Sequence, residues 1–325
     1  MALRADDLID RRRLRRKLTF WRIAAIAVAA IAITASASWT MRDSLGSVAR
    51  NHVAKIKIDG TITEDEELLE RLKKVTESAA VKGVILSIDS PGGTTAGGEA
   101  IYDAVRKLAA AKPVVAQVGT LAASAGYMIA SATDHIVARQ SSIVGSIGVL
   151  VQFPNFTGLM DKIGITLDEV KSSPLKAEPS PFNPTTEEER AMLRSMVLDS
   201  YDWFVGLVED RRPLTRAEVL TLADGSIFTG RQALDRKLVD ALGGEDTAKA
   251  WLTSKGVSAD LKVVEWKPRA STAGYLLSSS IAHRVAGLLG LPLASGDILR
   301  EIGAERIFLD GLLSVWHPEK AALSD

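Results

Sequence analysis

The sequence predicts an α/β protein, and two features of its middle part support this prediction. From residue 52 onward, short apolar segments typical of strands alternate with longer segments whose apolar residues recur at helical spacing. Short turns containing glycine join these segments, as in Asp89–Gly93. Alternation of this kind is typical of βαβ units with right-handed crossovers, which indicates an α/β architecture.

The first expected elements are a strand, a helix and a second strand. Val53–Ile58 alternates apolar and basic residues, as a strand with one buried face does. Asp65–Ser78 is rich in charge and carries its apolar residues at helical spacing, which predicts an amphipathic helix. Gly83–Ile88 is a short apolar run, so we expect a strand that stops at the Asp89–Gly93 turn.

The next segments continue this alternation. Ala96–Ala111 predicts a helix, and Pro113–Val118 predicts another apolar strand. An alanine-rich helix is expected from about Ser124 to Ala132, and His135–Ala138 returns as a strand.

The second half predicts mostly helices, interrupted by one long loop. Asn155–Ile163 has helical character, Thr166–Val170 resembles a strand, and Lys171–Pro184 contains four prolines and predicts a loop. A capping box within Thr185–Glu189 opens a long helix that runs to about Asp210.

The last 70 residues, 256–325, are expected to be a helical region whose role the sequence leaves open. Shorter helices precede it within residues 215–255, where Gly225, Gly230 and Gly243-Gly244 separate them. Leu276–Leu291 and Ile298–Trp316 have amphipathic helical character. Core packing, contacts between subunits and contacts with a membrane surface are all compatible with such segments.

The net charge of the chain is zero, but the charge is divided unevenly along it. Residues 1–22 hold eight basic and three acidic side chains, which gives +5, so the rest of the neutral chain carries −5. Ile23–Met41 follows without a single charge, and at 1.5 Å per residue its nineteen residues span about 28 Å as a helix. We therefore expect one transmembrane helix, with the arginine-rich segment in the cytoplasm.

Two other interpretations of Ile23–Met41 remain open. Ala35-Ser36-Ala37 resembles a cleavage site, so the segment can be a signal peptide that is removed. A buried core helix is the other alternative. The length and alanine content of the segment favour an uncleaved anchor.

Composition excludes several classes of function. The chain has no cysteine, which excludes disulfide scaffolds, thiolate metal sites and cysteine nucleophiles. Its four histidines are far apart in sequence, so we expect no metal site and no metal cofactor. Equal numbers of basic and acidic residues argue against a nucleic-acid partner.

Ser124 is the first candidate for chemistry. It follows a strand and a turn of small residues and stands where a helix begins, so its hydroxyl faces free backbone N–H groups. Such groups stabilise an oxyanion that develops on a substrate. An ordinary N-cap serine gives the same pattern, and position alone favours that interpretation.

The Ser90-Pro91-Gly92-Gly93 turn shifts the balance toward catalysis. Glycines at this place let the backbone approach a ligand and direct N–H groups at it. Together with Ser124, about thirty residues on, the turn predicts an oxyanion hole with two donors. We assign these donors to the backbone N–H groups of Gly93 and Ala125.

A serine nucleophile needs a base, and the sequence offers two kinds. His135 is eleven residues from Ser124, but its place in a strand favours a structural role. A lysine serves when its amine is neutral, which burial favours. Lys171 and Lys176 both lie in the proline-rich loop, and nothing local to either distinguishes it from an ordinary solvated lysine.

Four motifs in order resemble the signal peptide peptidase A family. They are Ser90–Gly93 (SPGG), Ala123–Tyr127 (ASAGY), Gly145–Val149 (GSIGV) and Val170–Lys176 (VKSSPLK). Each motif alone is weak, but the order and spacing of all four are specific. The resemblance covers roughly residues 52–250 and is to the short form of the family, with one catalytic domain.

The resemblance implies a role for each matched residue. Ser124 matches the nucleophile, Lys176 the general base, and Lys171 a lysine that is not catalytic. Ser146 matches a serine that forms a hydrogen bond with the lysine amine. Gly93 and Ala125 match the oxyanion donors, although the family commonly has glycine where Ala125 stands. If that position required a positive φ, alanine would cost about 1 kcal/mol or more.

The family resemblance also implies a fold, an activity and an assembly. It implies a ClpP/crotonase-like fold of repeated ββα units after the transmembrane helix. It further implies a Ser–Lys serine endopeptidase of the bacterial inner membrane, anchored by one pass, whose catalytic domain faces the periplasm. The expected substrates are remnant signal peptides or unfolded polypeptides. Homo-oligomers whose active sites combine residues of neighbouring chains are expected as well.

The resulting organisation has five parts, and two rival functions remain. The parts are a basic cytoplasmic segment (1–22), a transmembrane anchor (23–41), a linker (42–51), a peptidase domain (52–255) and the C-terminal region (256–325). A crotonase-like enzyme acting on acyl-CoA is one rival, because the SPGG turn suits that ligand too. A catalytically inactive membrane scaffold is the other.

Overall fold

The computed structural model describes Trp21, residues 50–268 and residues 313–315, and the account below concerns these. Trp21 is helical and exposed. None of the helices described there is long and apolar enough to cross a membrane. The predicted anchor, residues 23–41, lies outside the described residues, as does the predicted helix at 276–291.

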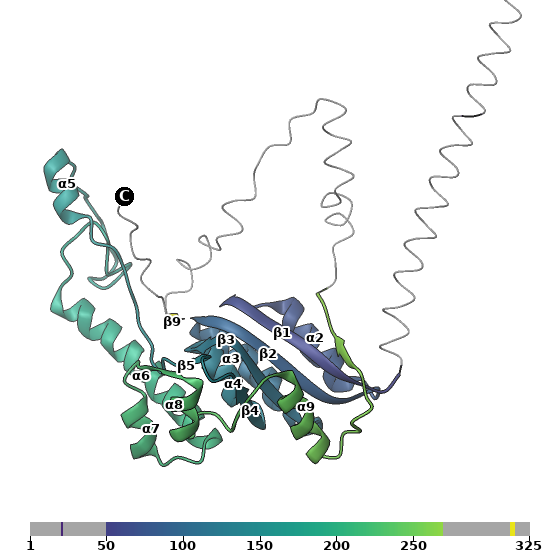
Figure 1. Cartoon of the computed structure of the whole chain (residues 1–325). Coiled ribbons are helices and arrows are strands. Elements are labelled where there is room, and N and C mark those ends of the chain that lie inside the picture. The colour runs from purple at the N-terminus through teal and green to yellow at the C-terminus, as the bar shows by residue number, and fades with distance from the viewer. Residues whose placement is uncertain (1–20, 22–49, 269–312, 316–325) are drawn as a thin grey trace, which may run out of the picture. The chain divides into compact units, whose positions relative to one another are not determined.

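The first half of the described chain alternates strands and helices (Figure 1). In order, its elements are β1 (His52–Ile62), α2 (Glu66–Glu77), β2 (Val81–Thr94), α3 (Thr95–Ala111), β3 (Val114–Ala123), α4 (Ala125–Ser131), β4 (His135–Ala138) and β5 (Ile143–Gly145). The local sequence sets several of these boundaries. Asp65 accepts a hydrogen bond from the backbone N–H of Leu68 and begins α2, while Thr94 accepts one from Gly97 and begins α3.

The second half is mainly helical. Its elements are α5 (Thr157–Ile163), α6 (Glu187–Arg211), α7 (Arg216–Leu222), β6 (Ile227–Thr229), α8 (Gly230–Asp235), β7 (Ala241–Leu242), α9 (Glu245–Ser254), β8 (Val263–Glu265) and β9 (Leu313–Val315). The predicted capping box at the start of α6 is confirmed, because Thr186 and Glu189 exchange side chain-to-backbone hydrogen bonds.

The nine strands found among the described residues belong to one sheet, whose main path runs β6-β5-β3-β2-β1-β8. The pairs around its centre are parallel: β2 with β3, and β3 with both β4 and β5. Two pairs are antiparallel, β5 with β6 and β2 with β9. The central strands β2 and β3 therefore end at the same edge of the sheet, which is where ligands bind in open α/β sheets.

The core lies on both faces of the central strands. Val84 and Leu86 are fully buried in the cluster that includes α2, α3, α4 and α6. Their neighbour Ile85 points to the opposite face, where it packs with Ala248 and Leu252 of α9. Burial on both faces explains why β2 and β3 are continuous apolar runs rather than alternating ones.

Three sequence predictions differ from the structure. Strand β2 does not stop at Ile88 but continues through the SPGG motif to Thr94. Thr166–Val170 is not a strand. The C-terminal region contains β8, and Leu313–Val315 is a strand where the amphipathic pattern predicted a helix. The last difference arises because pairing with β2 gives this short segment a partner that its local periodicity cannot reveal.

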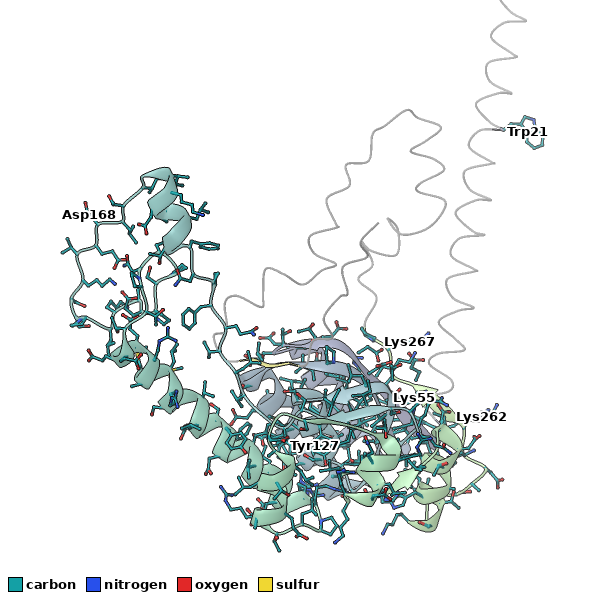
Figure 2. The ribbon with its side chains drawn as sticks, turned by 60° about the vertical axis from the view of Figure 1, so that its left-hand side comes forward. Trp21, Lys55, Tyr127, Asp168, Lys262 and Lys267 are labelled. Carbon is teal, nitrogen blue, oxygen red and sulfur yellow. The ribbon has the colours of Figure 1, made fainter. Side chains whose placement is uncertain are left out.

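Residues 151–186, which we call the arm, differ from the rest of the described chain. The arm includes α5, and in Figure 1 it lies at the end of α6 that is far from the sheet. None of the α5 side chains is buried, whereas α6 makes its apolar core contacts near its other end, through Phe204, Val205 and Val208. Figure 2 places Asp168 at the tip of the arm and Tyr127 in the body of the domain.

Candidate active site

Three of the four motifs from the sequence meet at one edge of the sheet. Strands β2 and β3 pair in parallel up to Ser90 and Ala122, so the rest of the SPGG motif continues β2 beside the chain that leads to Ser124. On the other side of β3, Ala123 is in register with Gly145 of β5, and the Ser124 N–H donates to the Gly145 carbonyl at 2.8 Å. The SPGG, ASAGY and GSIGV motifs are therefore neighbours in space.

Ser124 has a backbone conformation that serine seldom adopts. Its φ is 56° and its ψ is −120°, and its side chain is almost fully buried at the start of α4. The side chain does not cap the helix, so the ordinary N-cap interpretation is wrong. Strained residues of this kind cost about 1–3 kcal/mol and cluster at functional sites.

A hydrogen-bonded serine shapes the SPGG motif. The buried Ser90 hydroxyl donates to the Gly60 carbonyl at 2.6 Å, and the Gly92 N–H donates to the Ser90 oxygen at 3.1 Å. A Cβ atom placed on Gly93 would lie 1.8 Å from the Ile62 carbonyl oxygen. Only glycine therefore fits at position 93, where the backbone approaches β1 so closely.

The first residues of α4 also pack tightly against this motif. A Cβ on Gly126 would come within 3.0 Å of the Ser90 carbonyl oxygen, and one on Gly98 within 3.1 Å of the Ala125 methyl group. Ala125 is helical, so the left-handed conformation falls on Ser124 and not on Ala125. The alanine at this position therefore carries no cost from a positive φ, and its backbone N–H belongs to the first turn of α4.

Ser146 follows β5 in another strained conformation. Its φ is 51°, after a Gly145 φ of 105°, and its N–H donates to the Ser226 carbonyl at 2.7 Å. The residue is largely buried, and it lines a cavity of about 470 Å³ whose wall also includes Leu198, Tyr201 and Asp224. Ser146, the predicted partner of the lysine amine, thus directly follows Gly145, whose carbonyl accepts the hydrogen bond from the Ser124 N–H.

The two candidate lysines lie on the arm and differ in their surroundings. Lys171 forms ion pairs with Glu169 and Glu178, and the ion pair with Lys171 lowers the pKa of the Glu178 carboxyl. Lys176 is exposed and sits in a turn in which its N–H donates to the Ser173 carbonyl at 3.1 Å. The next residue, Ala177, has a φ of 63°. Lys171 is therefore engaged within the arm, whereas the Lys176 side chain faces solvent.

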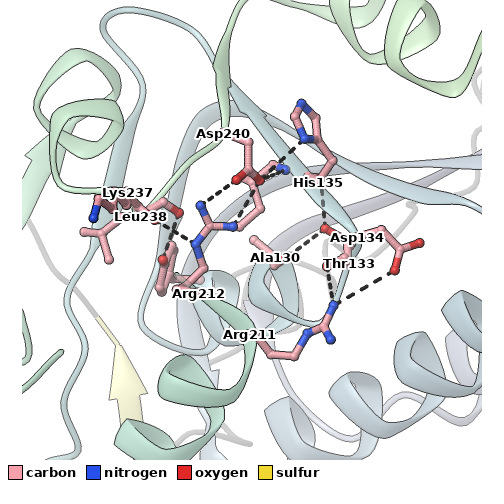
Figure 3. Close-up of polar contacts among 11 residues, drawn as sticks. Ala130, Thr133, Asp134, His135, Arg211, Arg212, Lys237, Leu238 and Asp240 are labelled. Carbon is pink, nitrogen blue, oxygen red and sulfur yellow. Dashed lines mark hydrogen bonds and ion pairs between the residues drawn. The ribbon is translucent and has the colours of Figure 1, made fainter. Parts of the chain in front are cut away.

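His135 stands at the opposite edge of the sheet from Ser124. In the parallel pair of β3 and β4, His135 lies beside Val115. Val115 precedes Ser124 by nine residues, and nine residues of extended strand span roughly 30 Å. Figure 3 shows its polar surroundings: its ring lies 3.7 Å from the Asp240 carboxylate, which Arg212 binds with two nitrogens. Its ring also stacks on Trp251 at 5.0 Å. Burial lowers the pKa of the His135 ring, and the structural role predicted for it agrees with this position.

Sequence reasoning missed two groups that organise the site. The Ser90 side chain was read only as part of a turn, and the Gly145 carbonyl carried no signal of its own. A serine ahead of Pro-Gly-Gly at a strand end is a hint, because its hydroxyl bonds the backbone two residues on. The Gly145 carbonyl becomes visible only once β5 pairs with β3.

Comparisons with known proteins identify two family patterns in the chain. The pattern of peptidase family S49 matches residues 106–260, and that of Clp protease matches residues 41–144. The sheet, its covering helices and the Clp protease match together define an α/β fold of the ClpP/crotonase type.

Individual relatives cover most of the chain. A protein of Enterococcus faecium named as signal peptide peptidase SppA is 33% identical over 265 residues, which are 75% of this chain and 74% of that protein. A Synechocystis protein named as a protease is 37% identical over 65% of this chain and 77% of its own length. The chloroplastic serine protease SPPA of Arabidopsis thaliana is 30% identical over 77% of this chain, which is 39% of that protein.

Proposed function

Because the chain belongs to peptidase family S49, a family of serine proteases, we propose that Ser124 and Lys176 are its nucleophile and general base. The observation that carries this proposal is the convergence of three motifs on Ser124, with the serine itself in a strained conformation. Lys176 is the base because Lys171 is held by two carboxylates and His135 lies at the wrong edge of the sheet.

The reaction begins with Ser124. Its Oγ attacks the carbonyl carbon of the scissile peptide bond, and the neutral Lys176 amine accepts the hydroxyl proton. The N–H groups of Gly93 and Ala125 donate hydrogen bonds to the oxyanion that forms. The Lys176 ammonium then protonates the leaving amine, and water hydrolyses the acyl-enzyme.

We propose that Lys176 comes from a neighbouring chain. A lysine serves as a base only when its amine is neutral, and burial favours the neutral form. In the single chain Lys176 is exposed on the arm, whereas Ser124 is buried in the body of the domain. A second copy that covers the arm would bury the Lys176 amine beside Ser146. The Ser146 hydroxyl would then form a hydrogen bond with the Lys176 nitrogen.

The surface of the arm supports an assembly of this kind. Seven large apolar side chains on the arm are exposed: Phe156, Leu159, Ile163, Ile165, Leu167, Val170 and Phe182. Gathered exposed apolar groups mark interaction surfaces in soluble domains. Contact with a second copy would cover them and carry Lys176 to its partner.

The N-terminal sequence supports a proposal for the location and the substrate. We propose that residues 23–41 anchor the chain with the basic segment in the cytoplasm, which would put the peptidase domain on the periplasmic side of a bacterial inner membrane. Peptides that remain in that membrane after protein export are remnant signal peptides. We propose these as substrates, in keeping with the name of the Enterococcus faecium relative.

The test compares cleavage by four full-length proteins in detergent. The unchanged chain, Ser124→Ala, Lys176→Ala and the control Lys162→Ala receive a fluorescent signal peptide or a denatured protein. We expect cleavage by the unchanged chain and by the Lys162→Ala variant, whose lysine also lies on the arm, and none by the other two. Equal cleavage by all four would remove both residues from the mechanism.

A further inference from the structure

Two consecutive arginines hold the end of α6 against the elements that follow the proposed nucleophile. Arg211 is the last residue of α6, and Arg212 comes directly after it. Figure 3 shows that their guanidinium groups have different neighbours: Arg211 contacts the end of α4, and Arg212 contacts the turn 236–240 that precedes β7. Because α4 begins directly after Ser124, the end of α6 is joined to the helix next to the nucleophile.

Arg211 binds carbonyl groups where α4 ends. Its Nε donates to the Ser131 carbonyl at 3.2 Å, and one of its Nη atoms donates to the Thr133 carbonyl at 3.0 Å. The last carbonyls of a helix have no partner within the helix, and the helix dipole favours a cation beside them. The Arg211 side chain therefore links the ends of two helices, α6 and α4.

Arg212 is buried and uses three nitrogens on two acceptors. Its side chain is only 6% exposed, and its Nη atoms donate to the two Asp240 carboxylate oxygens at 2.7 and 3.0 Å. Its Nε donates to the Lys237 carbonyl at 2.8 Å. A planar guanidinium bound in this bidentate way has a fixed orientation, whereas apolar packing is not directional.

The turn that Arg212 binds is itself attached to α4. The Tyr127 hydroxyl donates to the Leu238 carbonyl at 2.8 Å, and the Tyr127 side chain is completely buried. Tyr127 lies three residues after Ser124, in the first turns of α4. Both arginines therefore connect α6 to α4, Arg211 directly and Arg212 through the turn 236–240.

The length of α6 makes its angle important at the other end. The helix has 25 residues, so it is about 37 Å long, and the arm lies at its far end (Figure 1). A tilt of about 10° at Arg211 would move the far end by roughly 6 Å in a helix of this length. A general base must come within about 3 Å of the proton that it accepts, so such a displacement is large enough to separate a base from its serine.

We propose that Arg211 and Arg212 are positioning residues, which fix the angle of α6 and thereby the place at which the arm presents Lys176 to Ser124 of a neighbouring chain. The inference rests on the proposed function, since it takes Lys176 as the base. A buried ion pair is often no more stabilising than apolar residues of similar size. Phe204, Val205 and Val208 already supply apolar burial at this end of α6, so the arginines add direction rather than burial.

A pair of spin labels measures the position of the arm without reference to activity. The chain has no cysteine, so Lys107→Cys on α3 and Lys162→Cys on α5 introduce the only two thiols, both at exposed positions. Full-length labelled chains are assembled with an excess of unlabelled chains, so that double electron–electron resonance reports the distance between labels within one chain. We expect one narrow distance distribution when both arginines are present.

The variant Arg212→Met/Asp240→Asn removes the ion pair without leaving a buried charge alone. Asparagine at position 240 still accepts the hydrogen bond that the Ile136 N–H donates to Asp240 at 2.7 Å. We expect this variant to stay folded, with a broader or shifted distribution of label distances. The matched control Arg231→Met/Asp235→Asn makes the same substitutions at exposed positions of α8 and should keep the distribution narrow.

Peptide cleavage by the unlabelled proteins tests the consequence for the reaction. The kcat of Arg212→Met/Asp240→Asn should fall by about tenfold or more, because a misplaced base accepts the proton poorly. Circular dichroism and sedimentation should show that the variant is folded and assembled, and the kcat of the control should stay unchanged. Arg211→Met removes the contacts with the end of α4 and provides a second test if the first variant does not fold.

Each outcome decides for or against the inference. An unchanged distance distribution, or a changed distribution with unchanged kcat, would overturn it and leave the Ser124–Lys176 mechanism intact. Failure of both arginine variants to fold would also overturn it, because the arginines would then serve stability. If not even the unchanged chain cleaves a peptide, the proposed function fails together with the catalytic part of this inference. The spin labels then still show whether the arginines fix the arm.

Discussion

The body of the domain and the arm hold the two halves of the proposed dyad in opposite ways. Around Ser124, backbone hydrogen bonds and glycines with no room for a side chain fix three segments against each other. Around Lys176, the arm is exposed, carries apolar side chains in solvent and keeps a strained Ala177 next to the lysine. In the proposed mechanism the surroundings of the nucleophile lie within one chain, whereas the base becomes buried only when a second chain covers the arm. Substitutions in the two regions should therefore have different effects on stability, assembly and activity.

The largest expected effect separates the two lysines of the arm. Lys176→Ala should lower kcat by about 10³-fold or more, because the serine loses its base. Lys171→Ala removes ion pairs that lie within the arm and should change kcat by less than about tenfold. Steady-state kinetics with one fluorescent peptide measures both. A larger loss for Lys171→Ala would exchange the roles of the two residues.

The next effect contrasts glycines in the two regions. Gly93→Ala puts a methyl group 1.8 Å from the Ile62 carbonyl oxygen and should destabilise the domain by about 3 kcal/mol or more. Gly158→Ala lies in α5 with nothing within 4 Å, and alanine favours the helix by about 1 kcal/mol. Denaturant unfolding of the two variants measures the difference. Equal stabilities would mean that β1 yields at this position.

A third prediction concerns the apolar surface of the arm. Val170 is fully exposed, so Val170→Glu should leave the stability of the single chain within about 0.5 kcal/mol. If a second copy covers the arm, the same change should weaken assembly and lower cleavage by roughly tenfold or more. Sedimentation and cleavage assays on one preparation measure both, with Val170→Thr as the control. Loss of activity without loss of assembly would contradict this view of the arm.

The smallest effect is a pH dependence at the opposite edge of the sheet. Burial lowers the pKa of His135 in the folded chain, so the unfolded chain binds the proton more readily. Its contribution to stability is complete above the unfolded pKa of about 6.5 and is lost as pH falls through the lowered folded value. Between pH 7 and 5 the free energy of unfolding should therefore fall less steeply for His135→Gln than for the unchanged chain. If the free energy of unfolding depends on pH equally in both proteins, groups other than His135 dominate that dependence.

Local patterns predicted most of the body of the domain. Asp65 and Thr186 mark where helices begin, and both predictions are confirmed because capping is a contact within a few residues. The α/β class and the central strands could be predicted equally well, since strands buried on both faces are continuous apolar runs in the sequence.

Features that depend on pairing between strands far apart in the sequence could not be predicted from local patterns. The extension of β2 through Gly92 and Gly93 depends on β9, and the strand at Leu313–Val315 depends on β2. The position of Lys176 shows the same limit. A motif indicates which lysine to choose, but Lys176 is exposed among the described residues of one chain, and we propose that a second chain buries it.

The measurement that tests the central claim most directly is subunit mixing. Ser124→Ala chains retain Lys176, and Lys176→Ala chains retain Ser124, so each variant alone should be inactive. If the dyad forms between chains, co-expressed or remixed variants should recover a substantial part of the activity of the unchanged protein. If the dyad forms within one chain, the mixture should stay as inactive as its components. That result, obtained with hetero-oligomers shown to contain both variants, would contradict the account.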